Sequence, residues 1–442
     1  MKHRLFFLLI ILFALQSLWA QSENEMGLAA LLTMAGEKNR DIALAKLNQQ
    51  KALYLVKTSY SSLYPSISLS SAYSRMKGKT TGYVNIEGID FETESTYYNN
   101  NYSYGLNLNQ WLFLPQDISD IMTIARSDTT IANLAQQQSM ETAYYNIITS
   151  YFNYLKLKSL YNVALEEVSV TEDDMKRSQK MFDLGLLDKS TLLSARISYE
   201  TSQYNSIQAE NDMIQAKWQL CNLAGLDPAR DYHISDDGIV FALQDMDFSR
   251  QAEYAKRHNL GFLLQQQQGE RAEKTFRQAK HEYLPDLSIS ARAGYSDNEL
   301  PIRDYAISGG VSLSFSLFEG FRTRYNVAME KINMRQAVIE TEKAKDDLVY
   351  TVKQLLLQIK ALRDLLHLSQ STEEKAEQDL KLAKARFEAG LGIFLEVDDA
   401  RVTYIKARSD RFSAFYNLKA AYANLLLLRG DLLDHVRGIA AP

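Results

Sequence analysis

The sequence predicts a mainly α-helical protein with a small transmembrane β part, built as a two-fold internal repeat of long antiparallel helices and β-hairpins. Three observations predict this class. Two stretches match without gaps at a spacing of 205 residues, two long spans without proline carry helical periodicity, and four short segments alternate apolar and polar side chains.

The N-terminal residues 1–20 have the layout of a cleavable secretory signal. Lys2 and Arg4 precede an apolar run over residues 5–15, and Ala20 ends the segment. No later stretch has the roughly 18 consecutive apolar residues of a transmembrane helix. Export places the chain in an oxidising compartment, where the single Cys221 is expected to be a small apolar residue on a helix face. The net charge of −5 gives no indication of a nucleic-acid partner.

Proline and glycine positions divide the rest of the chain into two repeats and a linker. A helix of about 68 residues is about 100 Å long, the length of two of the shorter predicted helices end to end. Each half is therefore expected to pair one long helix with two short ones. The first repeat, 21–225, is predicted to hold a helix over 27–63, a β-hairpin over 65–113, a long helix over 116–183, a tip turn over 184–190 and a helix over 190–224. A linker over 226–247 follows. The second repeat, 248–430, is predicted to hold a helix over about 246–283, a β-hairpin over 285–318, a long helix over 320–388, a tip turn over 389–394 and a helix over 395–428. A C-terminal tail over 431–442 ends the chain.

The four predicted strands carry apolar residues on one face and Ser, Asn and Gly on the other. Pro65 and Pro285 stand just before the first strand of each hairpin, where a missing amide hydrogen does least harm. Strands of about 10 residues with this alternation are typical of a membrane barrel with lipid outside and water inside, and the alternative is a half-buried soluble sheet. The residues expected to face lipid are Ile67, Leu69, Leu106, Leu108, Leu287, Ile289, Val311 and Leu313. Aromatic residues suited to the two membrane interfaces are Tyr73, Tyr102, Tyr104 and Tyr295 at one level and Trp111, Phe113 and Phe318 at the other.

Four strands cannot close a membrane barrel, because the smallest such barrels have about 8 strands. Open sheet edges are not tolerated in hydrocarbon. The chain is therefore expected to oligomerise into a shared barrel of about 8, 12 or 16 strands.

The element order, with "F-x-x-G-L…A-R-x-x-Y" at both tips, resembles the TolC-like outer membrane efflux protein family over nearly all of the mature chain. The tip motif pairs Gly185 with Gly390 and Arg196 with Arg401, and the repeat endings "QLCNLAGL" and "NLLLLRGDL" match at the same spacing of 205 residues. This resemblance implies a homotrimer with a 12-stranded outer-membrane barrel and an α-helical tunnel in the periplasm. It further implies an exit duct for tripartite efflux pumps or type I secretion, with a periplasmic adaptor and an inner-membrane transporter as partners, and an equatorial position for the linker.

The two tips are expected to contain helix-ending glycines at positive φ, Gly185 and Gly390. Ser190 or Thr191 is expected to cap the helix that follows the first tip. The apolar residues of the tips either pack on one another or form a docking surface. The resemblance implies adaptor docking at the Gly-Leu turns, and the surface is expected to comprise Gly185, Leu186, Gly390, Leu391 and Phe394.

The acidic residues after the second tip resemble the constriction of the family. Glu396 and Asp399, with Asp398 beside them, are expected to form the periplasmic gate or selectivity ring. The alternative is ordinary acidic residues at the start of a helix. The tyrosine, arginine and acid that latch well-studied family members correspond here to Phe387, Gly392 and Thr191, so closure is expected to depend on packing or on other polar contacts.

Other functions have less support in the sequence. Asp236, Asp237 and Asp245 of the linker fit no EF-hand, and a solvated linker is expected there instead of a calcium site. A secreted coiled-coil scaffold or adhesin is the alternative to a duct, but it would need no alternating strands. No catalytic motif, cofactor or metal site is expected, and the transported substrate stays open between drugs, metal ions and proteins. The histidines of the mature chain, interpreted as surface or helix-packing residues, are His233, His258, His281, His367 and His435.

Overall fold

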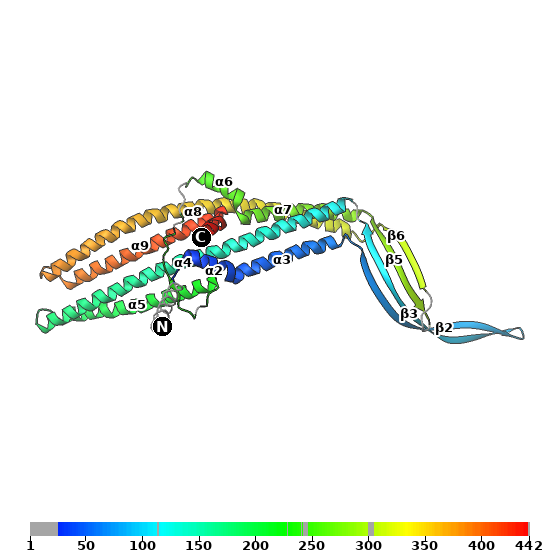
Figure 1. The fold of residues 1–442 in the computed structure, drawn as a ribbon, viewed down its shortest axis with the longest axis horizontal. Helices are drawn as coiled ribbons and strands as arrows, with labels where there is room; N and C mark the ends of the chain where they lie inside the picture. Colours follow the sequence, from blue (N-terminus) through cyan, green and yellow to red (C-terminus); the bar gives the residue numbers. More distant parts are fainter. Residues whose placement is uncertain are drawn as a thin grey trace, which may run out of the picture. The chain divides into compact units, whose positions relative to one another are not determined.

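The computed structural model describes residues 25–112, 115–227, 229–239, 241, 246–298 and 305–440. Secondary-structure elements recur in the same order in each half of the chain, as the predicted two-fold repeat requires (Figure 1). The residues form two compact units. The first unit contains the described residues within Met1–Gln49, Asn133–Gln265 and Glu342–Pro442, and the second contains those within Gln50–Ala132 and Gln266–Thr341.

Two helices dominate the chain, α4 (Pro115–Asp183) and α8 (Arg322–Glu388), of 69 and 67 residues. Each is followed after a short turn by a helix of 36 residues, α5 (Lys189–Ala224) or α9 (Phe394–Arg429), which runs back alongside it (Figure 1). Thr171 of α4 lies 2.7 Å from Ser202 of α5 through their hydroxyl oxygens, and Arg363 of α8 donates to the Tyr422 hydroxyl of α9 at 2.5 Å. The mainly α-helical class is therefore confirmed.

The helix expected over 27–63 is interrupted at Asn39, which separates α2 (Leu28–Lys38) from α3 (Arg40–Ser61). The Asn39 side-chain oxygen accepts from the Ile42 amide at 2.9 Å, so it caps α3. Its side-chain nitrogen donates to the Leu223 carbonyl at the end of α5 at 2.5 Å. One asparagine thus ends one helix, starts the next and ties both to the end of a third.

The second half repeats this junction at Asn259, between α6 (Phe248–His258) and α7 (Leu260–Ala279). Asn259 accepts from the Phe262 amide at 2.8 Å and donates to the Leu428 carbonyl of α9 at 3.0 Å. The prediction of single helices over 27–63 and 246–283 is therefore wrong at one residue in each. A 3₁₀ turn, η1 (Lys280–Tyr283), leads from α7 to the sheet.

The linker is anchored in the core by a few side chains, whereas most of its described residues, including Asp236 and Asp237, are exposed, as expected for a solvated segment. The short strand β1 (Glu25–Met26) pairs in parallel with β4 (His233–Ile234), and the side chains of Ile234 and Phe241 are only 0% and 3% exposed. Asp237 accepts hydrogen bonds from the Tyr151 hydroxyl and the Ala29 amide, at 3.1 and 3.3 Å. Among the described residues no cluster of His, Cys, Asp or Glu is arranged to hold a metal ion, and Asp245 lies outside them.

The main core lies where the linker, α2, α4, α5 and α9 meet, and the C-terminal helix α10 (Leu432–Ala440) joins it through Leu432 and Val436. Cys221 is buried in this core, as expected for a small apolar residue. In the described part of the chain, no helix has both the length and the apolar character needed to cross a membrane.

The sheet of the second unit has four antiparallel strands in the order β2, β3, β5, β6. Its strands are β2 (Ser66–Ile86), β3 (Ile89–Leu112), β5 (Asp286–Asp297) and β6 (Tyr305–Ser314). β3 pairs with β5 only from Tyr102 to Leu112, whereas it pairs with β2 as far as Ile86 and Ile89. The β2–β3 hairpin therefore continues beyond the sheet as a two-stranded ribbon (Figure 1).

The junction around Asn259 leads to a test of stability. Gly430 ends α9 at φ 76°, and a Cβ atom there would lie 2.1 Å from the His258 carbonyl oxygen. Gly430→Ala is expected to lower the free energy of unfolding by about 3 kcal/mol, because it combines steric overlap with an unfavourable backbone conformation.

Gly438→Ala is the matched control, because a Cβ at this glycine of α10 has open space around it. It is expected to raise stability by about 0.5–1 kcal/mol through helix propensity. Thermal unfolding of both variants gives the comparison, and equal shifts in Tm would contradict the tight approach at Gly430.

Candidate functional site

Both tip turns use the same backbone geometry. Gly185 and Gly390 adopt φ 75° and 72°, and the amide of the following leucine donates back to Met181 or Arg386 at 2.9 Å. This hydrogen bond and the positive φ are those of a Schellman helix end, where glycine carries no Cβ penalty. The repeat at a spacing of 205 residues is thus a repeat of turn geometry.

The cap of α5 differs from the expected one. Asp188, not Ser190 or Thr191, is the N-cap, and its carboxylate accepts from the Thr191 amide at 2.7 Å. The helix starts at Lys189, so Thr191 is already in its first turn and supplies the donor. The N-cap of α9 is Ile393, which makes no side-chain capping hydrogen bond.

Apolar side chains are exposed at both turns of the single chain. Leu186 and Leu391 expose 69% and 74% of their surface, so the matching leucines do not pack on one another within one chain. The turns also expose residues that sequence reasoning did not single out, namely Leu184 at 74% and Leu395 at 60%. The sequence signal that could have identified them is their position close to the tip glycines.

Phe394 does not belong to this exposed surface, which corrects its assignment to the docking tip. It is 6% exposed, and its ring lies edge-on to that of Phe387 at 6.0 Å between centroids. Phe394 is the first residue of α9, and its side chain turns back between the two helices. Its role is to hold α8 and α9 together just above the turn.

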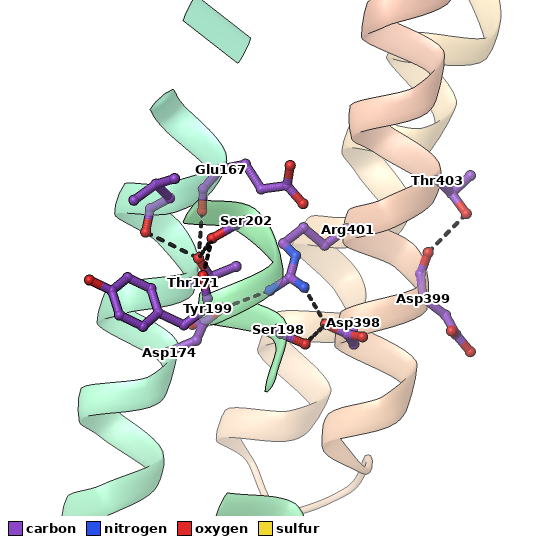
Figure 2. Close-up of polar contacts among 11 residues, drawn as sticks. Glu167, Thr171, Asp174, Ser198, Tyr199, Ser202, Asp398, Asp399, Arg401 and Thr403 are labelled. Atoms are coloured by element: carbon purple, nitrogen blue, oxygen red, sulfur yellow. Dashed lines mark hydrogen bonds and ion pairs between the residues drawn. The ribbon is translucent and has the colours of Figure 1, made fainter. Parts of the chain in front are cut away.

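The expected gate residue Asp398 is engaged inside the chain. Its carboxylate accepts from the guanidinium of Arg401 and from the Ser198 hydroxyl of α5, the latter at 2.9 Å (Figure 2). Arg401 is 4% exposed, and its Nη1 atom also lies 4.0 Å from Asp174 Oδ2 on α4. These contacts link α4, α5 and α9. We call the residues that make them the Arg401 cluster: Asp174, Ser198, Asp398 and Arg401.

Burial raises the pKa of Asp174 above its ordinary value, and the nearby cations Lys384, Arg401 and Arg177 oppose that rise. The pKa of Glu167 is raised for the same reason, with Arg401 opposing the rise and Asp398 adding to it. Removing a charge from solvent disfavours the ionised form, and a neighbouring opposite charge restores it. Arg401 therefore opposes the pKa rise at both carboxyl groups, and at Asp174 the larger opposing charge is that of Lys384.

The other two expected gate residues remain exposed. Asp399 points away from the Arg401 cluster (Figure 2). Glu396 is half exposed, and its Oε2 atom lies 3.9 Å from Arg386 Nη1, a weak contact at the surface. Of the three acids, Glu396 and Asp399 are exposed in the single chain, whereas Asp398 is held by Arg401.

Two further ion pairs join the α4/α5 pair to the α8/α9 pair. Arg177 of α4 contacts Glu388 of α8 at 2.6 Å, and Arg408 of α9 contacts Glu166 of α4 at the same distance. Sequence reasoning did not find these residues, because partners more than 200 positions apart have no local signal.

The sheet brings all eight expected lipid-facing residues onto one face. Directly paired residues of antiparallel strands share a face, and the register pairs Ile67 with Leu108, Leu69 with Leu106, Leu287 with Leu313 and Ile289 with Val311. β3 and β5 join these pairs through Leu112 opposite Leu287. We call this side of the sheet the apolar face.

A row of tyrosines crosses the apolar face toward the end of the sheet that lies away from the helices. Ring centroids are 4.9 Å apart for Tyr73 and Tyr102, 5.1 Å for Tyr104 and Tyr295, and 6.2 Å for Tyr295 and Tyr305. Trp111 and Phe318 are exposed at the other level, and Phe113 lies outside the described residues. Trp111 pairs with Ser288 and so lies on the polar face, which corrects its expected place at the lipid interface.

His281 is more than a surface residue. In η1 its Nδ1 contacts the carboxylate of Asp117 of α4, and its Nε2 lies 3.8 Å from Asp120 Oδ2. Asp120 is 5% exposed, so this contact supports the start of α4 beside the sheet. The sequence spacing between His281 and the two acids gave no sign of it.

Long helices in two antiparallel pairs, joined to a sheet with one apolar and one polar face, define the class of outer-membrane efflux channels. The family model for outer membrane efflux proteins matches residues 31–226 and 253–431, and the chain belongs to this family. It is a family of transport channels.

Particular relatives agree with this assignment. The chain is 23% identical over 418 residues to outer membrane protein TolC of Escherichia coli (strain K12), covering 89% of this chain and 78% of TolC. Its fold is similar to the outer membrane channel CmeC of Campylobacter jejuni, with a TM-score of 0.81, 17% identity and coverage of 93% and 89% of the two chains. It is also similar to the outer membrane protein VceC of Vibrio cholerae, with a TM-score of 0.76, 16% identity and coverage of 91% and 96%.

Replacing Arg401 tests the Arg401 cluster. Arg401→Gln leaves the partly buried Asp398 without its cation and Asp174 with only Lys384 and Arg177 nearby, and it is expected to lower the free energy of unfolding by about 3 kcal/mol. Arg196 occupies the equivalent repeat position but is exposed, so Arg196→Gln is expected to change stability by less than about 0.5 kcal/mol. Thermal unfolding compares the two, and an equal effect would show that burial of Arg401 has no energetic consequence.

Proposed function

We propose that the chain is the outer-membrane exit duct of a tripartite efflux pump or a type I secretion system. In this role it passively conducts substrate from an inner-membrane transporter and a periplasmic adaptor to the outside. The observation that carries the proposal is the four-stranded sheet, with an apolar face, a polar face and two unpaired edge strands, at the end of long helices.

The unpaired edges support a homotrimer. Within one chain, β2 and β6 each pair along one side only. Backbone groups exposed at such edges cost several kcal/mol each in hydrocarbon. Pairing β2 of one copy with β6 of the next satisfies both edges, and three copies of four strands give the 12-stranded barrel that the family resemblance implies.

The polar face of the sheet suits a water-filled interior. Residues opposite to the apolar face include the pairs Ser68 with Asn107, Ser70 with Gly105, and Ser288 with Ser312. In the trimer this face lines the pore, and the long helices continue the pore as a tunnel in the periplasm. Such a wall offers solvation without any arrangement for chemistry, which favours a conduit over an enzyme.

The exposed Gly-Leu turns are proposed to dock the periplasmic adaptor. Leu186 and Leu391 lie at the far ends of the helix pairs and are largely exposed, and Gly185 and Gly390 set the turn that presents them. Exposed apolar residues gathered at a turn suit a protein interface. Phe394 is excluded from this surface by its burial.

Leu391→Asp tests the docking surface. It places a charge in a proposed apolar contact and is expected to abolish transport, whereas Leu391→Met, which keeps the apolar surface, retains it. Transport is measured as export by whole cells, together with the amount of trimer in the outer membrane. Normal export by the Leu391→Asp variant at an unchanged trimer level would contradict the assignment of the Gly-Leu turns as the docking surface.

The second tip is also proposed to hold the periplasmic gate. Three copies of Glu396 and Asp399 would form two rings of carboxylates, and such rings select cations in pores. Since Phe387, Gly392 and Thr191 cannot form the latch of other family members, we assign closure to the Arg401 cluster and the Arg177–Glu388 pair.

Neutralising the rings tests the gate. Glu396→Gln with Asp399→Asn is expected to raise single-channel conductance and to weaken block by divalent cations, because both depend on the ring charge. The control is Asp410→Asn, which removes an exposed carboxylate on the same face of α9 as Asp399, about 16 Å along the helix from it. This variant is expected to leave both properties unchanged. If the double variant changes neither conductance nor block by divalent cations, Glu396 and Asp399 are not part of the gate.

A further inference from the structure

The apolar face continues beyond the tyrosine row into the β2–β3 ribbon, and there its chemistry changes to basic. The register pairs Tyr73 with Tyr102, and the next pairs on the same face are Arg75 with Asn100, Lys77 with Tyr98 and Lys79 with Thr96. Three cations therefore follow the tyrosines directly, at every second residue of β2.

The opposite face of the ribbon carries no charge at these levels. Its pairs are Met76 with Asn99, Gly78 with Tyr97 and Thr80 with Ser95. A ribbon that needed charge only for solubility would gain as much from basic residues on either side. The three cations are confined to the side that is continuous with the apolar face.

Arg75 and Lys77 are exposed, and among the described residues they form no ion pair. Both lie over the ring of Tyr98, with Arg75 Cζ at 4.8 Å and Lys77 Nζ at 5.7 Å from its centroid. These contacts hold the two cations at the surface and leave their N–H donors free. Lys79 contacts Glu94 at 3.0 Å, but both side chains are about two-thirds exposed, so the pair is weak.

A hollow lies in the apolar face on the other side of the tyrosine row. Small side chains form its floor, because β5 carries Ala293 where neighbouring strands carry Leu106 and Ile307. Apolar and aromatic side chains border it, so it suits one hydrocarbon chain. Its lining includes Leu69, Leu106, Ala293, Ile307, Tyr104 and Tyr295.

We propose that this side of the sheet binds a phosphorylated glycolipid of the outer leaflet, with an acyl chain in the hollow and phosphates at Arg75 and Lys77. The inference rests on the proposed function, which makes the apolar face lipid-exposed and places the ribbon on the outer side. Guanidinium and ammonium groups are the usual phosphate ligands in proteins, and tyrosine hydroxyls beside them suit sugar hydroxyls.

The spacing of the cations favours a headgroup with more than one phosphate. Residues two apart on a strand are separated by about 7 Å, so Arg75 to Lys79 spans about 14 Å. A single phosphate can bridge Arg75 and Lys77, which lie over the same Tyr98 ring, but only a headgroup with a second phosphate also engages Lys79. On β5, Asp297 lies opposite Tyr102, two strands away from Arg75, and on the same face of the ribbon Glu94 and Glu92 follow beyond Lys79, opposite Thr81 and Tyr83. The positive charge is therefore concentrated between the tyrosine row and Lys79.

Binding of defined lipids to the detergent-purified protein tests this site. The probes are diphosphorylated lipid A, monophosphorylated lipid A, phosphatidylglycerol and phosphatidylcholine, with bound lipid counted by native mass spectrometry. The wild type is expected to prefer the diphosphorylated lipid at least tenfold over the other three. Equal binding of phosphatidylglycerol would overturn the assignment to a phosphorylated glycolipid.

Charge variants locate the site. Arg75→Gln with Lys77→Gln is expected to lower affinity for diphosphorylated lipid A at least tenfold. Arg292→Gln removes a cation from the polar face of the same sheet, since Arg292 pairs with Asn107, and is expected to change affinity less than twofold. Wild-type affinity in the double variant, or an equal loss in Arg292→Gln, would overturn the site.

Ala293→Leu tests the hollow by filling it and is expected to lower the affinity for diphosphorylated lipid A severalfold. Unchanged affinity would contradict binding of the acyl chain in the hollow. Failure here is distinguishable from failure of the proposed function. A trimer that exports substrate but binds no lipid A contradicts only the lipid site, whereas a chain that never reaches the outer membrane contradicts the duct.

Discussion

The unpaired edges of the four-stranded sheet constrain the whole molecule. A sheet with an apolar face gains stability in lipid, but β2 and β6 leave rows of backbone N–H and C=O groups that lipid cannot satisfy. Only pairing with other copies removes both edges. An assembly of copies would also account for the many apolar side chains of α3, α5 and α8 that are exposed in a single chain.

Within one chain, each repeat places two short helices end to end beside one long helix. Asn39 and Asn259 each join two helices end to end and bind a carbonyl of the returning helix, so the breaks are also anchoring points. Near the turns, the Arg401 cluster links three helices through one buried guanidinium. The same sequence repeat thus carries different chemistry in each half, since Arg196 is exposed where Arg401 is buried.

Periodicity predicted the long helices and the two faces of the sheet, because both depend on local spacing of apolar residues. It missed the breaks at Asn39 and Asn259, where the deciding partner is a carbonyl about 170 to 180 residues away in sequence. Phe394 was expected to be exposed because it follows a glycine turn, yet it begins α9 and packs inward. Burial of Arg401 required knowledge of α4 and α5, which its own segment does not contain.

The mass of the detergent-purified protein tests the central constraint most directly. Native mass spectrometry, or light scattering corrected for bound detergent, reports the number of chains in the folded particle. Pairing of β2 with β6 across copies predicts a particle of several chains that persists on dilution, and the 12-stranded barrel implied by the family resemblance sets their number at three. A folded, monodisperse single chain with its sheet intact would contradict the account, because its edges would then need no partner.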